Sequence, residues 1–490
     1  MRITPFSSRP RPVLGGQRGA VAAAHPLATA AGQRLLMEGG SAVDALVAAQ
    51  AALCVLAPDA CGLGGDAFAL VREPGGRVLA VNGAGPSARR ADAMATSGGA
   101  SVTVPGLVDA WIALHGRWGR RPLEAVLAPA VGLAEAGFEV SPALVAARTA
   151  QEARLLAGGA GEWALLRLGS GDRFVQPALA RLLRAIGREG RAAFHEGPMA
   201  EAIARAVAEA GGRLDAEDLR AEVAQLAEPL RVEWGDIRIH VQPPASQGVL
   251  LALALHGWRR GGWDGAAPLD HLGVELTQAA FALRDDAAEG AALFDRLPDV
   301  DPERASRRGG PRAYLHTAGV ACADAEGLVV SSLLSVFDDF GSGVFVPEGG
   351  FTLNNRAGGF TSGANAFAPG KRPVHTLAPA LIEHPDGVAA LSTPGADGQV
   401  QTLLQVILRW LVRQDDLASA VDAPRWRSED GRLLVERGHE ATADLRARGH
   451  AVEEVAPGDI RFGAVTAAGL SGATPWSLGD WRRTTWAGVA

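Results

Sequence analysis

The pattern of apolar and polar positions divides the chain into a helical first part and a strand-rich later part. Residues 25–57 predict two helices interrupted by a Gly-Gly pair, with Ser41 as the N-cap of the second helix. From residue 104 to about 224, amphipathic segments separated by Gly and Pro predict further helices. Residues 247–290 also have a helical pattern, so helices dominate the first 290 residues.

Strands are predicted where apolar residues alternate with polar ones or form short runs between turns. A hairpin is expected over residues 66–81 around Pro-Gly-Gly, and a second over 317–336 around Ala-Glu-Gly. Further strands are expected at 229–242, 343–354 and 379–392, with helices returning near 397–413 and 438–448. This order favours an α/β (α+β) fold, an αββα sandwich in which two antiparallel sheets lie between layers of helices.

Residues 290–316 differ from both patterns, because they are polar and rich in Pro, Gly and Arg. They predict an exposed, mobile linker that ends at Thr317, the first residue of an apolar strand. A threonine can attack the peptide bond that precedes it, and cleavage frees an α-amine beside the hydroxyl. Because such an amine has a pKa near 8, it can act as the general base for that hydroxyl. Many strands begin with threonine, so this feature alone does not establish such a site.

Composition narrows the range of functions. The chain has 490 residues, 48% of them hydrophobic, and a net charge of -7 without long runs of one sign. Neither a nucleic acid nor a membrane surface is therefore expected as a partner. The three cysteines form no CxxC pair, which argues against a disulfide scaffold or a structural zinc site. We expect a cytoplasmic protein, because the N-terminus lacks the apolar core of a secretory signal and no apolar run reaches about 18 residues.

Common catalytic motifs of other fold classes are missing from the sequence. There is no GxGxxG after a predicted strand, no Walker A loop, no HExxH and no GxSxG. A dinucleotide-binding fold, a zinc protease and an α/β-hydrolase are therefore disfavoured.

Instead, a series of motifs runs in order along nearly the whole chain. The first half contains GAVAAAHPLATAAGQRLLMEGGSAVDALVAAQAAL, CGLGGDAFALV, VTVPGLVDAW, FHEGPMAEAI and PPASQG. The second half contains ADAEGLVVSS, FGSGVFVP, LNN, PGKRP, LAPALI and STPGA. By these motifs the chain resembles the γ-glutamyltransferase family of self-cleaving N-terminal-nucleophile enzymes.

The resemblance implies the position of the catalytic machinery. It places the nucleophile at Thr317 and the scissile bond at His316–Thr317, so that the fragments are 1–316 and 317–490. The two fragments would remain together as one folded heterodimer, with a higher homo-oligomer as a further possibility. The second active-site hydroxyl falls on Ser335, and no metal or organic cofactor is expected.

The resemblance also implies an oxyanion hole formed by two successive backbone N–H groups. In this sequence they belong to Gly395 and Ala396, in the STPGA segment. Alanine is acceptable at the second position if its φ angle is negative, since the donor is a backbone group.

Several positions depart from the family pattern. The family's Thr-Thr-His becomes Thr-Ala-Gly at Thr317, which removes a neighbouring hydroxyl. The positions that bind the amino-acid end of a γ-glutamyl group have also changed. They correspond here to Asn82, Phe337, Arg356, Gly359, His375 and Thr376. Two of these residues could instead have no role in substrate binding. Arg356 could lie on the surface, and His375 could be a loop histidine whose hydrogen bonds are all made within the protein.

These departures predict retained machinery with an altered donor. A buried Asp recognises an ammonium and a buried Arg recognises a carboxylate, and the family's residues for both roles are replaced. The leading hypothesis is a hydrolase or acyltransferase that forms an acyl-Thr317 intermediate from a small carboxylate-bearing amide, with water or an amine as acceptor. Oxamate-type amidohydrolases and glutaryl-type acylases occur in this family. The alternatives are a genuine γ-glutamyltransferase or glutathione hydrolase, and an uncleaved, catalytically silent binding protein.

Overall fold

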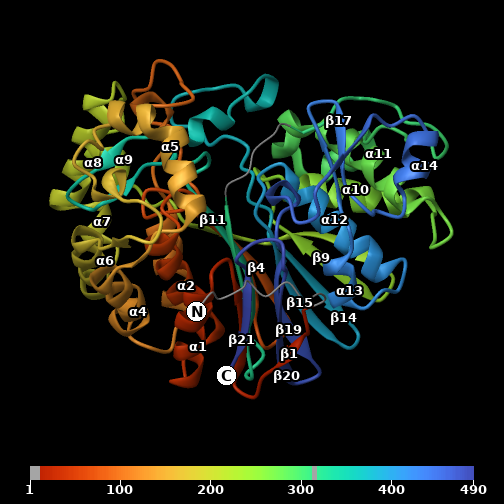
Figure 1. Cartoon of the computed structure of the whole chain (residues 1–490), viewed down its shortest axis with the longest axis horizontal. Helices are drawn as coiled ribbons and strands as arrows, with labels where there is room; N and C mark the ends of the chain where they lie inside the picture. The colour runs from red at the N-terminus through yellow and green to blue at the C-terminus, as the bar shows by residue number, and fades with distance from the viewer. Residues whose placement is uncertain (1–10, 312–316) are drawn as a thin grey trace.

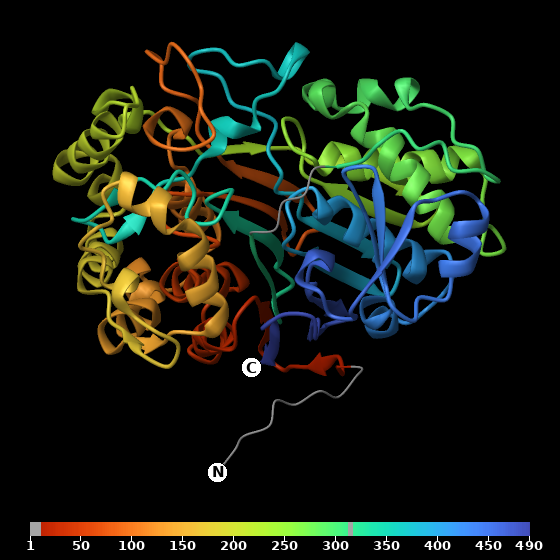
Figure 2. The same ribbon diagram turned by 45° about the horizontal axis from the view of Figure 1, so that its top comes forward.

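Four layers make up the molecule: helices, two sheets face to face, and helices again (Figures 1 and 2). The structure is a computed structural model that describes residues 11–311 and 317–490. The predicted αββα sandwich is therefore confirmed. Within these residues no helix is long and apolar enough to cross a lipid bilayer.

The first sheet has seven antiparallel strands and contains both predicted hairpins. Its order is β21 (Trp486–Val489), β2 (Gly19–Ala23), β10 (Ala318–Asp324), β11 (Val329–Ser335), β3 (Asp66–Arg72), β4 (Val78–Gly83) and β7 (Gln225–Ala227). The central strands β10 and β11 are buried on both faces. They consist mostly of small and apolar residues and do not alternate with exposed polar ones, because a sheet covers one face and helices cover the other.

The second sheet packs on the first and also has seven antiparallel strands. Its order is β1 (Leu14–Gly15), β20 (Thr474–Gly479), β19 (Thr466–Ser471), β15 (Gly387–Ser392), β14 (Ala380–His384), β9 (Ile237–Val241) and β8 (Leu230–Trp234). Small and branched residues such as Ala321, Val329, Leu381 and Ala468 fill the space between the sheets. The C-terminal strands β19, β20 and β21 were not predicted from the sequence.

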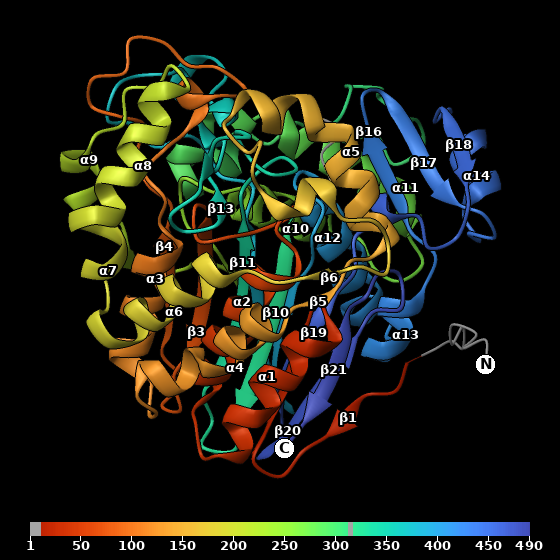
Figure 3. The ribbon, with the colours of Figure 1, turned by 60° about the vertical axis from the view of Figure 1, so that its left-hand side comes forward.

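Helices cover the outer face of each sheet. On the first sheet lie α1 (Pro26–Met37), α2 (Ala42–Leu56) and α3 (Leu107–Trp118); Figure 3 shows α1 and α2 in front of β10. Around them pack α4 (Leu123–Ala136), α5 (Pro142–Ala157), α6 (Pro177–Glu189), α7 (Ala192–His195), α8 (Gly197–Glu209) and α9 (Ala216–Arg220). On the second sheet lie α10 (Gly248–Gly261), α11 (Leu269–Phe281), α12 (Gly398–Leu411) and α13 (Leu417–Asp422).

Smaller elements complete the chain. Beside α11 lies a three-stranded sheet of β16 (Trp426–Glu429), β17 (Arg432–Glu436) and β18 (Val452–Val455), together with α14 (Thr442–Ala447). The remaining strands are two residues long: β5 (Phe138–Glu139), β6 (Arg173–Phe174), β12 (Phe345–Val346) and β13 (Phe351–Thr352). The short 3-10 segments are η1 (Gly99–Ser101), η2 (Ala164–Arg167), η3 (Arg284–Arg296), η4 (Arg356–Gly359), η5 (Gly363–Asn365) and η6 (Ile460–Phe462).

The start of α2 forms as the sequence predicts. Ser41 Oγ caps the helix by accepting a hydrogen bond from Asp44 N–H at 3.1 Å. The Asp44 carboxylate in turn accepts a hydrogen bond from Ser41 N–H at 2.8 Å. This reciprocal pair satisfies two backbone donors at a buried helix end. The cap fixes α2 against β10, since Asp324 also accepts a hydrogen bond from Ala42 N–H.

The segment before the predicted cleavage point lies along α11. Its first part belongs to η3, and residues 297–311 contain no helix or strand. The carboxylate of Glu275 on α11 accepts a hydrogen bond from Ser306 N–H at 3.1 Å and pairs with Arg308 at 3.6 Å. Nearby, the two imidazoles of His271 and His450 share a 2.8 Å hydrogen bond.

Candidate active site

Thr317 immediately precedes the central strand of the first sheet. In the antiparallel pair β10–β11, Ala318 lies opposite Leu334, and extending this register by one residue places Thr317 opposite Ser335. Ser335 is in turn the register partner of Asp66 on β3. Directly opposed residues project to the same face of a sheet. Thr317, Ser335 and Asp66 therefore form one row across three strands, and each is at most 4% exposed.

The hydroxyl of Thr317 lies beside the start of α12. Gln399, near the first turn of this helix, points its side-chain amide at Thr317 Oγ1 over 3.4 Å. Its own carbonyl oxygen accepts a hydrogen bond from Ala378 N–H at 3.0 Å, which fixes the amide orientation. The sequence analysis did not single out Gln399, because no local pattern links it to a residue 82 positions away.

Ser335 occupies the end of β11. Its Oγ accepts a hydrogen bond from Phe337 N–H at 2.8 Å. Phe337 has a φ of +85°, so the chain turns sharply directly after the serine. The serine hydroxyl and the aromatic ring of the next turn are thereby held in a fixed relationship.

The segment expected to form the oxyanion hole precedes α12. Gly395 has a φ of +126° and Ala396 a φ of +46°. The negative φ that would make alanine acceptable at this position is therefore not found. The carbonyl oxygens of both residues are held by the helix start, since they accept hydrogen bonds from Gly398 N–H at 2.7 Å and from Gln399 N–H at 3.0 Å.

The N–H groups of this segment remain available. Within residues 11–311 and 317–490, neither Gly395 N–H nor Ala396 N–H has a hydrogen-bond acceptor. The buried guanidinium of Arg427 also approaches the Gly395 carbonyl, at 3.4 Å. In a trans peptide the C=O and the following N–H point in opposite directions, so this contact turns Ala396 N–H away from Arg427. Two successive donors at a helix N-terminus form a site suited to developing negative charge.

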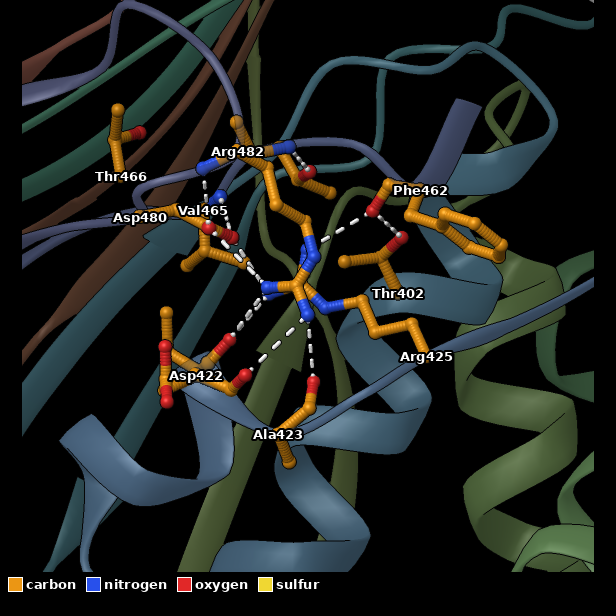
Figure 4. Close-up of polar contacts among 12 residues, drawn as sticks. Thr402, Asp422, Ala423, Arg425, Phe462, Val465, Thr466, Asp480 and Arg482 are labelled. Atoms are coloured by element: carbon orange, nitrogen blue, oxygen red, sulfur yellow. Dashed lines mark hydrogen bonds and ion pairs between the residues drawn. The ribbon is translucent and has the colours of Figure 1, made fainter. Parts of the chain in front are cut away.

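The loop before α12 rests on a buried ion network (Figure 4). Arg425 donates to Asp480 at 2.6 Å and to the Phe462 carbonyl at 2.9 Å, and Thr402 on α12 donates to the same carbonyl at 3.2 Å. Arg482 binds both oxygens of Glu436, at 2.7 and 3.0 Å, and also Asp480. The network fixes α12 against the strands that follow it, which stabilises the position of the loop.

Arg356 is completely buried, so its alternative placement on the surface is wrong. Its Nε donates to Asp66 Oδ2 at 3.0 Å and its Nη1 to Thr376 Oγ1 at 3.3 Å. The ring of Phe337 stacks on the guanidinium, with 4.5 Å from Cζ to the ring centroid. Burial lowers the pKa of Arg356 from its ordinary value, while the neighbouring Asp66 opposes that shift. Three positions chosen from the sequence thus meet at one side chain.

His375 joins the same cluster as a neutral side chain. Its Nδ1 accepts a hydrogen bond from Leu377 N–H at 3.1 Å, so its proton is on Nε2, which donates to Asp66 Oδ2 at 3.1 Å. Burial, followed by the positive charge of Arg356, lowers the pKa of His375 to about 4. Both ring nitrogens of His375 are therefore hydrogen-bonded within the protein, as expected for a histidine without a role in substrate binding, although the side chain lies within the cluster.

Asp66 connects these groups, and the sequence analysis missed it. It is the first residue of β3, directly after the Gly-rich turn, and its side chain is 0% exposed. The signal was present in the sequence, since a lone acidic residue in CGLGGDAFALV interrupts an otherwise apolar and Gly-rich run. A buried carboxylate requires a partner, so this aspartate could have been predicted to bind a cation or a hydrogen-bond donor.

The other predicted positions contribute less directly. Asn82 Oδ1 accepts a hydrogen bond from Ala84 N–H at 3.0 Å, which is a contact within its own turn. Gly359 ends the same 3-10 segment that begins with Arg356, and an added Cβ would lie 3.4 Å from Pro373 Cβ. His316 lies outside the described residues.

One group of metal-type ligands occurs in the described part of the chain: His271, Glu275 and His450, with ligand atoms within 4.8 Å of one another. His271 Nε2 donates to the Asp301 carbonyl at 2.8 Å, so its Nδ1 accepts from His450. Glu275 already contacts a cation, Arg308, at 3.6 Å. These contacts account for the cluster without a bound ion.

Comparison with known families gives one match across most of the chain. The family model described as Gamma-glutamyltranspeptidase matches residues 28–292 and 299–489. The oxamate amidohydrolase proenzyme of Klebsiella pneumoniae is 34% identical over 488 residues, covering 89% of this chain and 92% of that protein. The glutathione hydrolase-like YwrD proenzyme of Bacillus subtilis is 32% identical over 498 residues, covering 92% and 94%.

A solved structure has the same fold over its full length. The crystal structure of cephalosporin acylase from Bacillus halodurans superposes with a TM-score of 0.89 and 28% sequence identity, covering 100% of this chain and 99% of that one. The overall fold of this chain is thus also that of a cephalosporin acylase.

Proposed function

The chain belongs to the gamma-glutamyltranspeptidase family, and we propose that it is a self-cleaving amide hydrolase in which Thr317 forms the acyl-enzyme. The observation that carries the proposal is the placement of Thr317. It lies in one row with Ser335, beside Gln399, and the open N–H groups of Gly395 and Ala396 precede the same helix. A nucleophile, a supporting hydroxyl and oxyanion donors are the parts that acyl transfer requires.

Activation begins within the chain. Thr317 Oγ adds to the carbonyl carbon of His316, the C–N bond breaks, and the nitrogen of Thr317 receives the hydroxyl proton. Water then hydrolyses the resulting ester, which releases the His316 carboxylate and leaves Thr317 with a free α-amine. The products are the fragments 1–316 and 317–490, which stay together as one heterodimer because β10 lies between β2 and β11 in a single sheet.

The mature site then acts on an external amide. The α-amine of Thr317 takes the hydroxyl proton as Oγ adds to the amide carbonyl, and the N–H groups of Gly395 and Ala396 stabilise the oxyanion. As the C–N bond breaks, the ammonium returns the proton to the leaving nitrogen. A water molecule, or an amine acceptor, attacks the acyl-Thr317 ester by the reverse sequence and frees the hydroxyl. This chemistry needs no metal or organic cofactor.

The donor is proposed to be a small carboxylate-bearing amide rather than a standard γ-glutamyl compound. Arg356 is a buried cation near the nucleophile row, whereas Gly359 offers no carboxylate for an α-amine. The resemblance to an oxamate amidohydrolase agrees with such a donor. Genuine glutathione hydrolysis is the second candidate, supported by the resemblance to a glutathione hydrolase-like protein.

Intact-mass analysis and N-terminal sequencing test the proposal. Wild type is expected to yield two fragments, the smaller one starting at Thr317, while Thr317→Ala stays whole. Thr29→Ala removes another buried threonine hydroxyl, one that donates to the Trp486 carbonyl, and should still cleave. A wild-type chain that remains uncleaved after prolonged incubation would favour the silent binding protein instead.

A further inference from the structure

We propose that Asp66 and Arg356 form a carboxylate-binding subsite for the acyl part of the donor, with Asp66 as the residue that positions the guanidinium. The inference rests on the proposed function, because it assigns the part of the donor that this cluster recognises. Arg356 would touch the substrate, whereas Asp66 acts through Arg356.

The hydrogen bonds of Arg356 leave capacity for a ligand. A guanidinium has five N–H groups, and the described residues accept from two of them, one on Nε and one on Nη1. Nη2 is buried and has no acceptor in the described part of the chain. Since the side chain is 0% exposed, bulk water cannot satisfy these donors. A planar carboxylate matches the remaining donors of a held guanidinium.

The hydrogen-bonding groups of the cluster favour an anion. Burial, followed by the positive charges of Arg356 and Arg284, lowers the pKa of His375 to about 4, so this imidazole is neutral. Arg284 is itself paired with Asp285 at 4.0 Å. Asp66 is the carboxylate in direct contact with Arg356, and Asp338 acts on it from further away. Asp338 is itself bound by Asn355 Nδ2 at 2.7 Å. An ammonium group has no acceptor to offer the open N–H donors of Arg356, and the guanidinium would repel it.

The row across the sheet sets the length of the donor. Asp66 and Thr317 flank Ser335 on adjacent strands, and neighbouring strands lie about 4.8 Å apart. The nucleophile and the Asp66 backbone are therefore about 10 Å apart, and Arg356 lies at the Asp66 end of that span, in contact with the Asp66 carboxylate. A donor carboxylate bound to Arg356 must lie only a few bonds from the scissile carbonyl. Monoamides of short dicarboxylic acids have this spacing.

Asp66 decides how Arg356 is presented. Its Oδ2 accepts from Arg356 Nε at 3.0 Å and from His375 Nε2 at 3.1 Å, so it ties the guanidinium to a second fixed side chain. Asp66 begins β3 and lies opposite Ser335 on β11. The hydrogen bond from Arg356 to Asp66 therefore fixes the arginine relative to the strand beside the nucleophile. Removing the carboxylate would leave the guanidinium buried beside Phe337 and without its ionic partner.

A titration with succinate, a dicarboxylate of the product type, tests the subsite without requiring turnover. Succinate should stabilise the wild-type protein in a thermal-shift or calorimetric titration, whereas uncharged succinamide should not. Arg356→Lys and Asp66→Asn should each weaken succinate binding about 30-fold or more, as expected when one partner of a buried charged contact is removed.

The matched control is Asp109→Asn. Asp109 is a buried carboxylate that contacts Arg191 at 2.8 Å and His195 at 3.4 Å in the helical layer, so it resembles Asp66 in being buried beside an arginine and a histidine. This variant should bind succinate as wild type does. With succinamic acid as donor, Asp66→Asn should raise KM while kcat is largely kept, which a general loss of folding would not produce.

The outcomes separate this inference from the proposed function. Succinate binding that is indifferent to Arg356 and Asp66, in a protein that still cleaves itself at Thr317, overturns the subsite alone. Equal binding of succinate and succinamide overturns it as well. Failure to cleave overturns the proposed function. The succinate titration on the uncleaved chain would still measure whether Arg356 and Asp66 bind a carboxylate.

Discussion

The side-chain amide of Gln399 donates a hydrogen bond to Thr317 Oγ1 over 3.4 Å. This contact joins the start of α12, a helix that packs on the second sheet, to the residue before β10 of the first sheet. Because the segment of Gly395 and Ala396 precedes the same helix, α12 positions both the proposed nucleophile and the proposed oxyanion donors.

Gln399→Ala should slow both self-cleavage and turnover by about fivefold, because a neutral hydrogen bond contributes about 1 kcal/mol. Gln405→Ala is the matched control, since Gln405 is a buried glutamine on the same helix whose amide donates to the Gln401 and Trp426 carbonyls. Single-turnover rates of both variants distinguish the two cases. Equal rates for Gln399→Ala and wild type would contradict a role for this amide.

Ser335→Ala should lower kcat about tenfold and delay self-cleavage, because the hydroxyl opposite Thr317 is lost together with its bond from Phe337 N–H. Ser335→Thr should keep most of the activity, since it retains the hydroxyl. The measurement is a cleavage time course by mass spectrometry beside steady-state kinetics. An alanine variant as fast as the threonine variant would remove the supporting role.

Ala396→Gly should raise the free energy of unfolding by about 0.5–1 kcal/mol, because Ala396 has a φ of +46° and glycine adopts this region without strain. Ala396→Val should do the reverse, since a β-branched residue is disfavoured there. Urea denaturation in the uncleaved Thr317→Ala background measures both. The glycine variant should keep kcat within about twofold, as the donor is a backbone N–H group.

The stability of the protein should fall as the pH is lowered from 6.5 towards 4. Burial holds the pKa of His375 at about 4, so in this window the unfolded chain binds a proton that the folded chain does not. The full shift corresponds to about 3 kcal/mol. His195 and His450 also have pKa values lowered to about 4 and act in the same direction.

His375→Gln isolates this contribution, because it removes the titrating group while keeping a donor for Asp66. Its melting temperature should depend less steeply on pH between 6.5 and 4 than that of wild type. His384→Gln, at a half-buried position, serves as the control. Parallel curves for His375→Gln and wild type would show that the His375 proton does not contribute.

Asp480→Asn should destabilise the protein by about 3 kcal/mol, because Arg425 and Arg482 would lose a shared carboxylate in a buried network. The oxyanion segment should become less fixed as a consequence, so kcat should fall even where the variant is fully folded. Asp459→Asn is the comparison, since Asp459 pairs with Arg461 at a partly exposed site. Denaturation and kinetics at a temperature below both transitions measure the two effects separately.

Local sequence patterns were enough for many of the elements. The Ser41 N-cap and the hairpins β3–β4 and β10–β11 form where their residues predict them. Each depends on residues close together in the chain, such as a cap and its helix, or two strands and their turn. The family was likewise identified from contiguous motifs, and the family model confirms it.

Tertiary structure decided the composition of the candidate site. Arg356 and Asp66 are 290 positions apart, so no local pattern shows that the two side chains are buried together and form an ion pair. Gln399 on α12 and Arg427 on β16 come much later in the sequence than Thr317, yet their side chains contact Thr317 and Gly395. Ala396, which has a left-handed backbone conformation, is held by the start of α12. The strands β19, β20 and β21 were missed because their burial depends on the sheets into which they insert. The sequence by itself determined most of the helices, the two hairpins and the position of Thr317 before a strand, because these follow from neighbouring residues. The packing of distant segments determined which charges meet beside Thr317, because burial and ion pairing exist only once those segments are in contact.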